Sequence, residues 1–409
     1  MMTLLYLLLL PMLSGIGMLG LGPALMAGRA GAAHVVLLLS GLLLPLRGLV
    51  YLLLARRRGN RPGRMSVVLA AVELLLGAGL LLLPQLSVRL FAVVVAVYLT
   101  LLVTVEAVNA ILYGRMRRWG AFFPAMAAAV GGTGLFVLIV FVPALRDDAL
   151  RYTTALLLTV FGTGLVCDVL ALTIRSRRVR RVLGSIRVAL PDLMSLFLPQ
   201  RTADVLPRAP LGPVPQQGTE EFELLFQTSA HGIGLVGHCE LCFDGRTLTY
   251  GAYDPVHQRL LRTAGAGIVF SAPREPYLRW CIGTHHRRVI SYSLCLPPAQ
   301  AAQLRAELER FRQTLSPWQP EALPEDCFAG RLRRLGGVRF WRVQRGPYAT
   351  YFIPTINCVS LTNELLEKTD IGRTVMLGLK TPGAYLDLLE REYLAGNPAV
   401  TARRVYDRI

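Results

Sequence analysis

Acidic residues are scarce in the first 181 residues of this 409-residue chain, which hold five of them against 18 arginines. The remainder is much closer to balance, with 26 basic and 21 acidic residues. Most of the net charge of +18 therefore comes from a strongly apolar region in which arginines flank hydrophobic runs. That placement is typical of a membrane protein, and it does not predict a nucleic-acid partner.

The sequence also lacks a paired cysteine framework and a signal-peptide cleavage site. Its seven cysteines are scattered, which argues against a secreted, disulfide-rich fold. The apolar N-terminus has no basic start, so we interpret it as a first transmembrane helix and not as a removable leader. One C-x-x-C occurs, Cys239 to Cys242, but residues three apart on a strand point to opposite faces. The sequence therefore predicts no metal site.

Six apolar runs are long enough to cross a membrane: roughly 3–27, 33–55, 66–84, 90–113, 121–144 and 152–174. Pro23, Pro84 and Pro143 lie 61 and 59 residues apart and mark the tips of three predicted hairpins. This period indicates a two-helix unit repeated three times. Arginine clusters follow each even-numbered run, so the positive-inside bias predicts a multi-pass protein of the inner (plasma) membrane with both termini cytoplasmic.

The segment ELLLGAGLLLLPQLSVRLFAVVVAVYLTLLVTVEAVNAIL, residues 73–112, resembles the HdeD-type bacterial membrane proteins. In that family a glycine-rich helix, a proline turn and a second helix repeat three times. The resemblance covers about residues 1–180. It implies a six-helix membrane domain associated with stress, with no catalytic residues to carry over.

Three charged residues are predicted at mid-depth in the membrane: Arg47, Glu106 and Asp168 each precede an arginine of a closing cluster by nine residues. At about 1.5 Å per residue, they lie about 13 Å from the interface. Charges at that depth are costly unless they are paired inside the bundle. We therefore expect either a structural ion cluster that joins the repeats or a path for protons or ions.

The chain divides into residues 1–181, the membrane domain, residues 182–218, an amphipathic segment and proline-rich linker, and residues 219–409, a cytoplasmic α+β domain. Strands are predicted at 222–229, 238–243, 246–253, 289–296, 338–343 and 348–353, and helices at 298–315 and from 358 onward. The dipeptide Asp244-Gly245 predicts a hairpin turn between the second and third strands.

Cys358 lies where a loop turns into a helix, in PTINCVSLTNELL. Pro354 disfavours helix for the residue before it and Asn357 is a preferred N-cap, so the helix should begin at Cys358. The positive end of the helix dipole favours the thiolate, which is the nucleophilic form. We therefore expect the pKa of Cys358 to lie below its free value of about 8.5. The alternative is a small buried residue at a helix start.

His238 begins the strand HCELCF and could serve as the base that a cysteine nucleophile needs. His231, beside the glycine-rich segment GIGLVG, is the weaker alternative. That segment matches the dinucleotide pattern G-x-G-x-x-G, but a strand follows it where the pattern requires a helix. The sequence therefore predicts no nucleotide cofactor.

The order of GH, strand, turn and strand, followed about 120 residues later by NC at a helix start, resembles the circularly permuted NlpC-type, papain-like cysteine hydrolases, lecithin retinol acyltransferase among them. The resemblance covers roughly 222–370 and gives the roles of base and nucleophile to His238 and Cys358. A third residue should orient the imidazole from the next strand, where Tyr250, Tyr253 and Asp254 are candidates. The family often has a histidine there, and this chain has none.

Taken together, these features predict a membrane-tethered cysteine hydrolase or acyltransferase that acts on an amide, ester or thioester at the cytoplasmic membrane face. Its expected partners are the lipid bilayer and a lipidated or membrane-embedded substrate. The alternative is a non-enzymatic HdeD-like stress protein, or an ion- or proton-handling bundle, with a binding-only soluble domain. The sequence leaves the substrate and the oligomeric state open.

Overall fold

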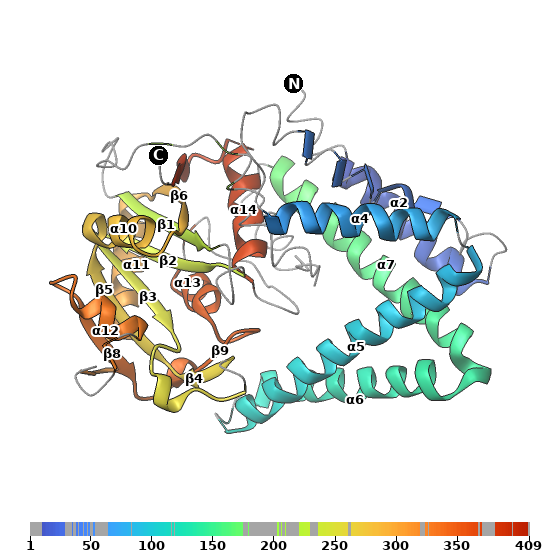
Figure 1. The fold of residues 1–409 in the computed structure, drawn as a ribbon, viewed down its shortest axis with the longest axis horizontal. Helices are drawn as coiled ribbons and strands as arrows, with labels where there is room; N and C mark the ends of the chain where they lie inside the picture. The colour runs from blue at the N-terminus through green and yellow to red at the C-terminus, as the bar shows by residue number, and fades with distance from the viewer. Residues whose placement is uncertain are drawn as a thin grey trace. The chain divides into compact units, whose positions relative to one another are not determined.

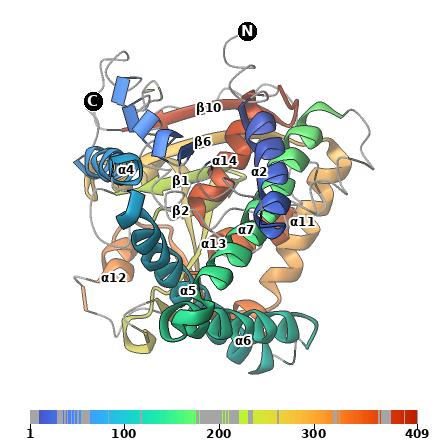
Figure 2. The same ribbon diagram turned by 90° about the vertical axis from the view of Figure 1, so that its right-hand side faces the viewer.

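The computed structural model describes residues 10–28, 64–82, 84–115, 119–174, 221–229, 236–260, 263–319, 327–366, 381–394 and 396–407, with scattered positions elsewhere, most of them between 35 and 53. The chain forms two compact units, residues 1–176 with 186–188, and residues 177–185 with 189–409. The first unit is helical and the second contains the β-sheets, as Figures 1 and 2 show. The predicted segment 182–218 lies almost wholly outside the described residues.

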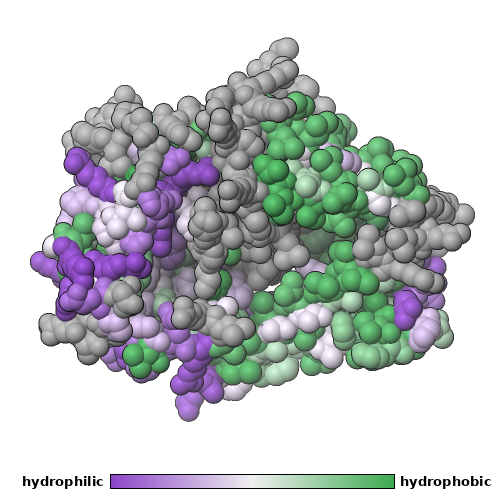
Figure 3. Space-filling model, viewed as in Figure 1, coloured by the Kyte–Doolittle hydropathy of each residue, from purple (hydrophilic) through white to green (hydrophobic). Residues whose placement is uncertain are grey.

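The helical unit contains α2 (Leu10–Met26), α4 (Arg64–Leu82), α5 (Pro84–Arg115), α6 (Trp119–Phe141) and α7 (Pro143–Thr173). Three stretches are long and apolar enough to cross a membrane, namely Ala92–Arg115, Phe122–Phe141 and Pro143–Cys167. Hydrophobic surface covers these helices in Figure 3, which suits contact with lipid. The described residues thus indicate a membrane protein, but they do not support six spans, because the apolar stretches of α2 and α4 are shorter.

The pairs that the repeat predicts, α4 with α5 and α6 with α7, are in contact, but the described helices pack more extensively in two other pairs. α5 packs along α6, and α2 packs along α7. Pro84 and Pro143, which we expected at hairpin tips, are the first residues of α5 and α7, and only one residue separates each helix from the one before it. Proline suits this position because its missing N–H would have no partner in the first turn.

A side-chain contact also joins α7 to the end of α6. The Nε of Arg146 on α7 donates to the Ile139 carbonyl, 2.7 Å away.

Glycines allow the close approach of α2 and α7. A Cβ at Gly162 would lie 2.7 Å from the carbonyl oxygen of Gly15, so a side chain there would push the helices apart. Of the predicted mid-depth charges, Glu106 accepts a 3.2 Å hydrogen bond from the Asn109 amide. Arg47 and the side chain of Asp168 lie outside the described residues, so the ion cluster stays a prediction.

The second unit is built on an eight-stranded antiparallel sheet of order β10-β6-β1-β2-β3-β5-β8-β7. The strands are β1 (Glu221–Thr228), β2 (His238–Phe243), β3 (Arg246–Gly251), β5 (Ile268–Pro273), β6 (Arg288–Cys295), β7 (Leu315–Pro317), β8 (Arg339–Val343) and β10 (Val400–Tyr406). A small second sheet pairs β4 (Ala264–Ala266) with β9 (Thr350–Phe352). With its helices this unit is an α+β domain, as predicted.

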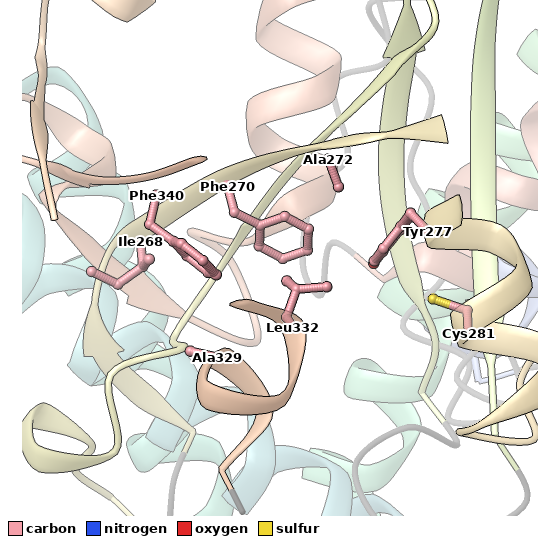
Figure 4. Packing of buried hydrophobic residues seen from close by; sticks show 8 residues of the cluster. All are labelled: Ile268, Phe270, Ala272, Tyr277, Cys281, Ala329, Leu332 and Phe340. Atoms are coloured by element: carbon pink, nitrogen blue, oxygen red, sulfur yellow. The ribbon is translucent and has the colours of Figure 1, made fainter. Parts of the chain in front are cut away.

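Helices cover both faces of the large sheet. On one face lie α10 (Arg274–Gly283) and α12 (Phe328–Arg333), whose Tyr277, Cys281 and Leu332 pack against Phe270 and its neighbours (Figure 4). On the other face lie α13 (Cys358–Leu366) and α14 (Pro382–Leu394), with α11 (Pro298–Arg312) beside α13. Successive side chains of β2 point to opposite faces of the sheet, so they contact different helices.

The β2–β3 hairpin forms where the sequence predicts it. Asp244 and Gly245 both adopt positive φ angles, 48° and 69°, which a two-residue turn of this kind requires. Cys242 packs with α10 residues, whereas the Cys239 thiol faces Thr362 of α13. The prediction that the two thiols of the C-x-x-C point to opposite faces is confirmed.

Part of the predicted linker belongs to the sheet domain. The amide of Ala209 donates to the carbonyl of Val405 on the edge strand β10, at 2.8 Å, and the Ala209 side chain packs beside Leu225 and its cluster. Ala209 is therefore attached to the sheet domain, although the prolines predicted that it belongs to an extended linker.

Candidate active site

The start of α13 is fixed by its cap. The Asn357 side-chain oxygen accepts from the Ser360 amide at 3.1 Å, three residues on, and the Asn357 side-chain nitrogen donates to the Ile353 carbonyl at 2.5 Å. This is the arrangement by which asparagine satisfies the unpaired amides of a first helical turn. The predicted N-cap and the predicted start of the helix at Cys358 are both confirmed.

Strands β2 and β3 separate just where Cys358 approaches them. Their pairing runs from Phe243 and Arg246 to Leu241 and Leu248 and then stops. The amide of Cys239 instead donates to the Cys358 sulfur, at 3.4 Å. The thiol of a helix-start cysteine is thus held against the backbone of the residue that follows His238.

The Cys358 sulfur also receives hydrogen bonds from the Val359 amide and the Tyr351 hydroxyl. Tyr351 is on β9, and the neighbouring β9 backbone is fixed by Tyr250, whose hydroxyl donates to the carbonyls of Tyr348 at 2.9 Å and Thr350 at 3.2 Å. Donors that converge on sulfur stabilise its anion. Our sequence reasoning missed Tyr351, although YATYFI was correctly predicted to be a strand.

The expected low pKa of Cys358 is wrong for this structure. Burial raises the pKa of the thiol to about 11, although the hydrogen bonds from Cys239, Val359 and Tyr351 lower it. The side chain is 3% exposed, so the loss of hydration outweighs the donors. Cys358 is therefore a neutral thiol at pH 7.

His238 points to the other face of the sheet. It lies opposite Gln227 in the strand register, and Glu240, two residues on, faces α10 with it. The Nε2 of His238 forms a 3.1 Å hydrogen bond with the Tyr253 hydroxyl. Burial, helped by the positive charge of Arg287, lowers the pKa of His238 to about 3, so the imidazole is neutral at pH 7.

Of the three candidates for the orienting residue, the structure places Tyr253 on the imidazole. The Tyr250 hydroxyl bonds to β9 instead. Asp254 is buried and bonds to the Nδ1 of His257 at 2.7 Å and to the guanidinium of Arg342. Sequence alone could not separate these candidates, because Tyr253 follows the end of β3 and its direction depends on the loop.

The two predicted catalytic residues are brought to the same end of β2 without a mutual hydrogen bond. Among the residues that the structure describes, the imidazole bonds to Tyr253 and the sulfur to Cys239, Val359 and Tyr351. Their catalytic pairing stays a prediction. The alternative base His231 lies outside the described residues.

A buried acid lies beneath His238. Glu240 accepts hydrogen bonds from the Tyr277 hydroxyl at 2.6 Å and from the Gln227 amide at 2.7 Å. Burial raises the pKa of Glu240 to about 7, against the effect of these donors and of Arg287. This carboxyl therefore changes charge near neutral pH and adds a negative charge below the imidazole as pH rises.

Within the described parts of the chain, histidine, cysteine, aspartate and glutamate side chains do not form a group that could hold a metal ion. Comparisons of the chain with protein-family models, curated proteins and solved structures found no match. The resemblances to HdeD-type and papain-like proteins therefore stay predictions, and the site must be interpreted from its own geometry.

Proposed function

We propose that this protein is a membrane-tethered cysteine hydrolase or acyltransferase of papain-like type, with Cys358 as nucleophile and His238 as base. The observation that carries the proposal is the 3.4 Å contact between the Cys358 sulfur and the amide that follows His238. A capped helix start, converging donors and a histidine at the same end of β2 are components that thiol catalysis uses.

In the proposed reaction His238 takes the thiol proton and Cys358 attacks the carbonyl carbon of an amide, ester or thioester. The bond to the leaving group breaks as the imidazolium returns the proton to it, which leaves an acyl group on sulfur. Water or an acceptor hydroxyl or amine then takes the acyl group and restores the thiol. The amides of Cys239 and Val359 and the hydroxyl of Tyr351 are placed to stabilise negative charge beside the sulfur.

The magnitudes indicate that the site must open before it reacts. Proton transfer from a thiol of pKa about 11 to an imidazole of pKa about 3 costs about 11 kcal/mol. With ordinary pKa values of about 8.5 for the thiol and 6.5 for the imidazole, the cost falls to roughly 3 kcal/mol. We therefore propose that substrate entry, or hydration of the site, brings both groups towards their ordinary values.

The proposal can be tested with the full-length protein in detergent and 4-nitrophenyl butyrate. We expect mass spectrometry to find one butyryl group on Cys358 and none in Cys358→Ala. His238→Gln should slow acylation by roughly 10²- to 10⁴-fold. Cys295→Ala, which removes a partly exposed thiol at the end of β6 far from His238, should leave it unchanged.

The enzymatic function would be refuted if only other thiols were butyrylated and Cys358 reacted only after the protein unfolded. That outcome would favour a binding-only domain on an HdeD-like bundle, which is our second candidate. The observation behind it is that both groups are neutral at pH 7 and that Cys358 is buried. The first candidate needs them to become accessible, whereas the second does not.

We also propose that the sheet domain lies in the cytoplasm, with the six-span repeat as the full membrane arrangement. Phosphatase fusions after Arg118, Asp148 and Gln200 should be inactive, active and inactive, respectively. Fluorescent-protein fusions should give the reverse pattern. The expectation follows from the arginine clusters that flank the apolar runs. An active phosphatase after Gln200 would put the sheet domain outside.

A further inference from the structure

An aromatic and cationic cluster adjoins the His238 imidazole. We call it the Phe328 cluster, and it consists of Tyr253, Trp280, His285, Arg287 and Phe328. Tyr253, which bonds to His238, stacks on Phe328 with ring centroids 5.1 Å apart and planes 17° apart. Trp280 meets the same Phe328 ring edge-on at 5.4 Å. All five side chains are partly exposed, so a ligand can reach them.

Arg287 supplies the charge of the Phe328 cluster. Its guanidinium carbon lies 5.3 Å from the Phe328 ring centroid, and one nitrogen donates to the Gln227 side-chain oxygen at 2.7 Å. Gln227 is itself fixed by Glu240 and Tyr277, so the guanidinium is anchored from one side. A guanidinium has five N–H donors, and Arg287 forms no ion pair with any residue that the structure describes.

Two further observations indicate an anionic ligand. The Nε2 of His285 is buried and has no hydrogen-bond partner among the described residues, so it can bond to an incoming group. His285 also packs on Trp280, with centroids 4.2 Å apart. Burial lowers the pKa of His285 to about 4, and the positive charges of Arg287 and the exposed Arg331 contribute to this shift, so two arginine charges act on the imidazole. The nearby acid, Glu240, is buried and already accepts two hydrogen bonds.

We propose that the Phe328 cluster binds an anionic group, a carboxylate or phosphate, on the substrate of Cys358. Arg287 donates charged hydrogen bonds to the anion, and the rings of Phe328 and Trp280 contact the adjoining apolar part. This inference rests on the proposed function, because it gives that site its substrate class. A role in anion binding also explains why Arg287 lies near His238 and His285, although its charge disfavours protonation of both.

The test compares two esters in the full-length protein. For the 4-nitrophenyl half-ester of glutarate, Arg287→Gln should raise KM about tenfold. For neutral 4-nitrophenyl butyrate it should leave KM unchanged, and the change in kcat that follows from losing the Arg287 charge near His238 should be the same for both esters. Arg287→Lys should restore part of the KM loss. Arg279→Gln, an exposed arginine of α10 paired with Glu275, is the matched control and should behave as wild type.

Competition then separates the two anions. Glutarate or inorganic phosphate should inhibit wild-type turnover of the half-ester, and the stronger inhibitor identifies the preferred group. An equal rise in KM for both esters in Arg287→Gln, or no rise for either, would overturn the inference. If the wild type hydrolyses neither ester, the proposed function fails by itself. Calorimetry then measures the affinities of glutarate and phosphate for wild type and Arg287→Gln. Equal affinities in the two proteins would overturn the proposed anion site.

Discussion

Replacing Arg274 by methionine should destabilise the sheet domain by about 3–5 kcal/mol, because it leaves a buried carboxylate without its partner. Arg274, the first residue of α10, donates to both oxygens of Glu223 on β1, at 2.5 and 2.7 Å. Ser291 on β6 also donates to Glu223, and Tyr406 on β10 accepts from Arg274. The pair therefore ties a helix to three strands.

The loss should appear as a lower urea midpoint for tryptophan fluorescence of the full-length protein in detergent. Arg279→Met is the control, since its exposed pair with Glu275 should contribute no more than about 1 kcal/mol. The double variant Glu223→Leu/Arg274→Met should recover much of the stability, because no buried charge is left alone. A single variant as stable as the control would mean that Glu223 is hydrated and that the pair contributes little.

Acid should destabilise the sheet domain through His238. Its pKa is lowered from 6.5 in the unfolded chain to about 3 in the fold, so the unfolded state binds the proton first. The stability that the neutral imidazole contributes is complete above pH 6.5 and is lost as pH falls towards 3. The expected loss is about 3–5 kcal/mol.

The measurement is the urea midpoint at several pH values between 7.5 and 4 for wild type and His238→Gln. Glutamine can keep a hydrogen bond to Tyr253 but does not titrate, so its stability should fall less with acid. Glu240 acts with the opposite sign, because its raised pKa favours the fold at low pH. Both proteins contain Glu240, and the difference between them isolates His238. Parallel pH profiles would show that the imidazole is hydrated in the fold.

The sequence predicted best what depends on neighbouring residues. Asp244-Gly245 specifies its turn and Asn357 specifies its helix start through contacts within a few residues. β10 was missed because VTARRVY alternates only weakly, and its pairing partner β6 lies over a hundred residues earlier. α14 had a usable signal, since PGAYLDLLEREYL repeats its apolar residues with a helical period.

The site shows the same limit. His238 and Cys358 could be chosen from local signals, but the contact of Tyr351 with the sulfur depends on the pairing of β9 with β4, nearly ninety residues apart in the chain. The low pKa that we predicted for Cys358 from the helix dipole was wrong because the sequence does not reveal how deeply the thiol is buried. Burial of Cys358 results from packing among β2, β9 and α13, and no short stretch of sequence reveals it.

The contact of Ala209 with β10 has a consequence for solubility. An edge strand with unpaired amides and carbonyls is a template for pairing with another copy, and sheets that lose their edge cover aggregate. At the opposite edge β7 is only three residues long and ends in Pro317, which limits such pairing. At the β10 edge Ala209 provides cover, because its amide pairs with the Val405 carbonyl. A soluble fragment that begins at residue 216 or 219 would lose that cover, whereas one that begins near residue 200 would keep it.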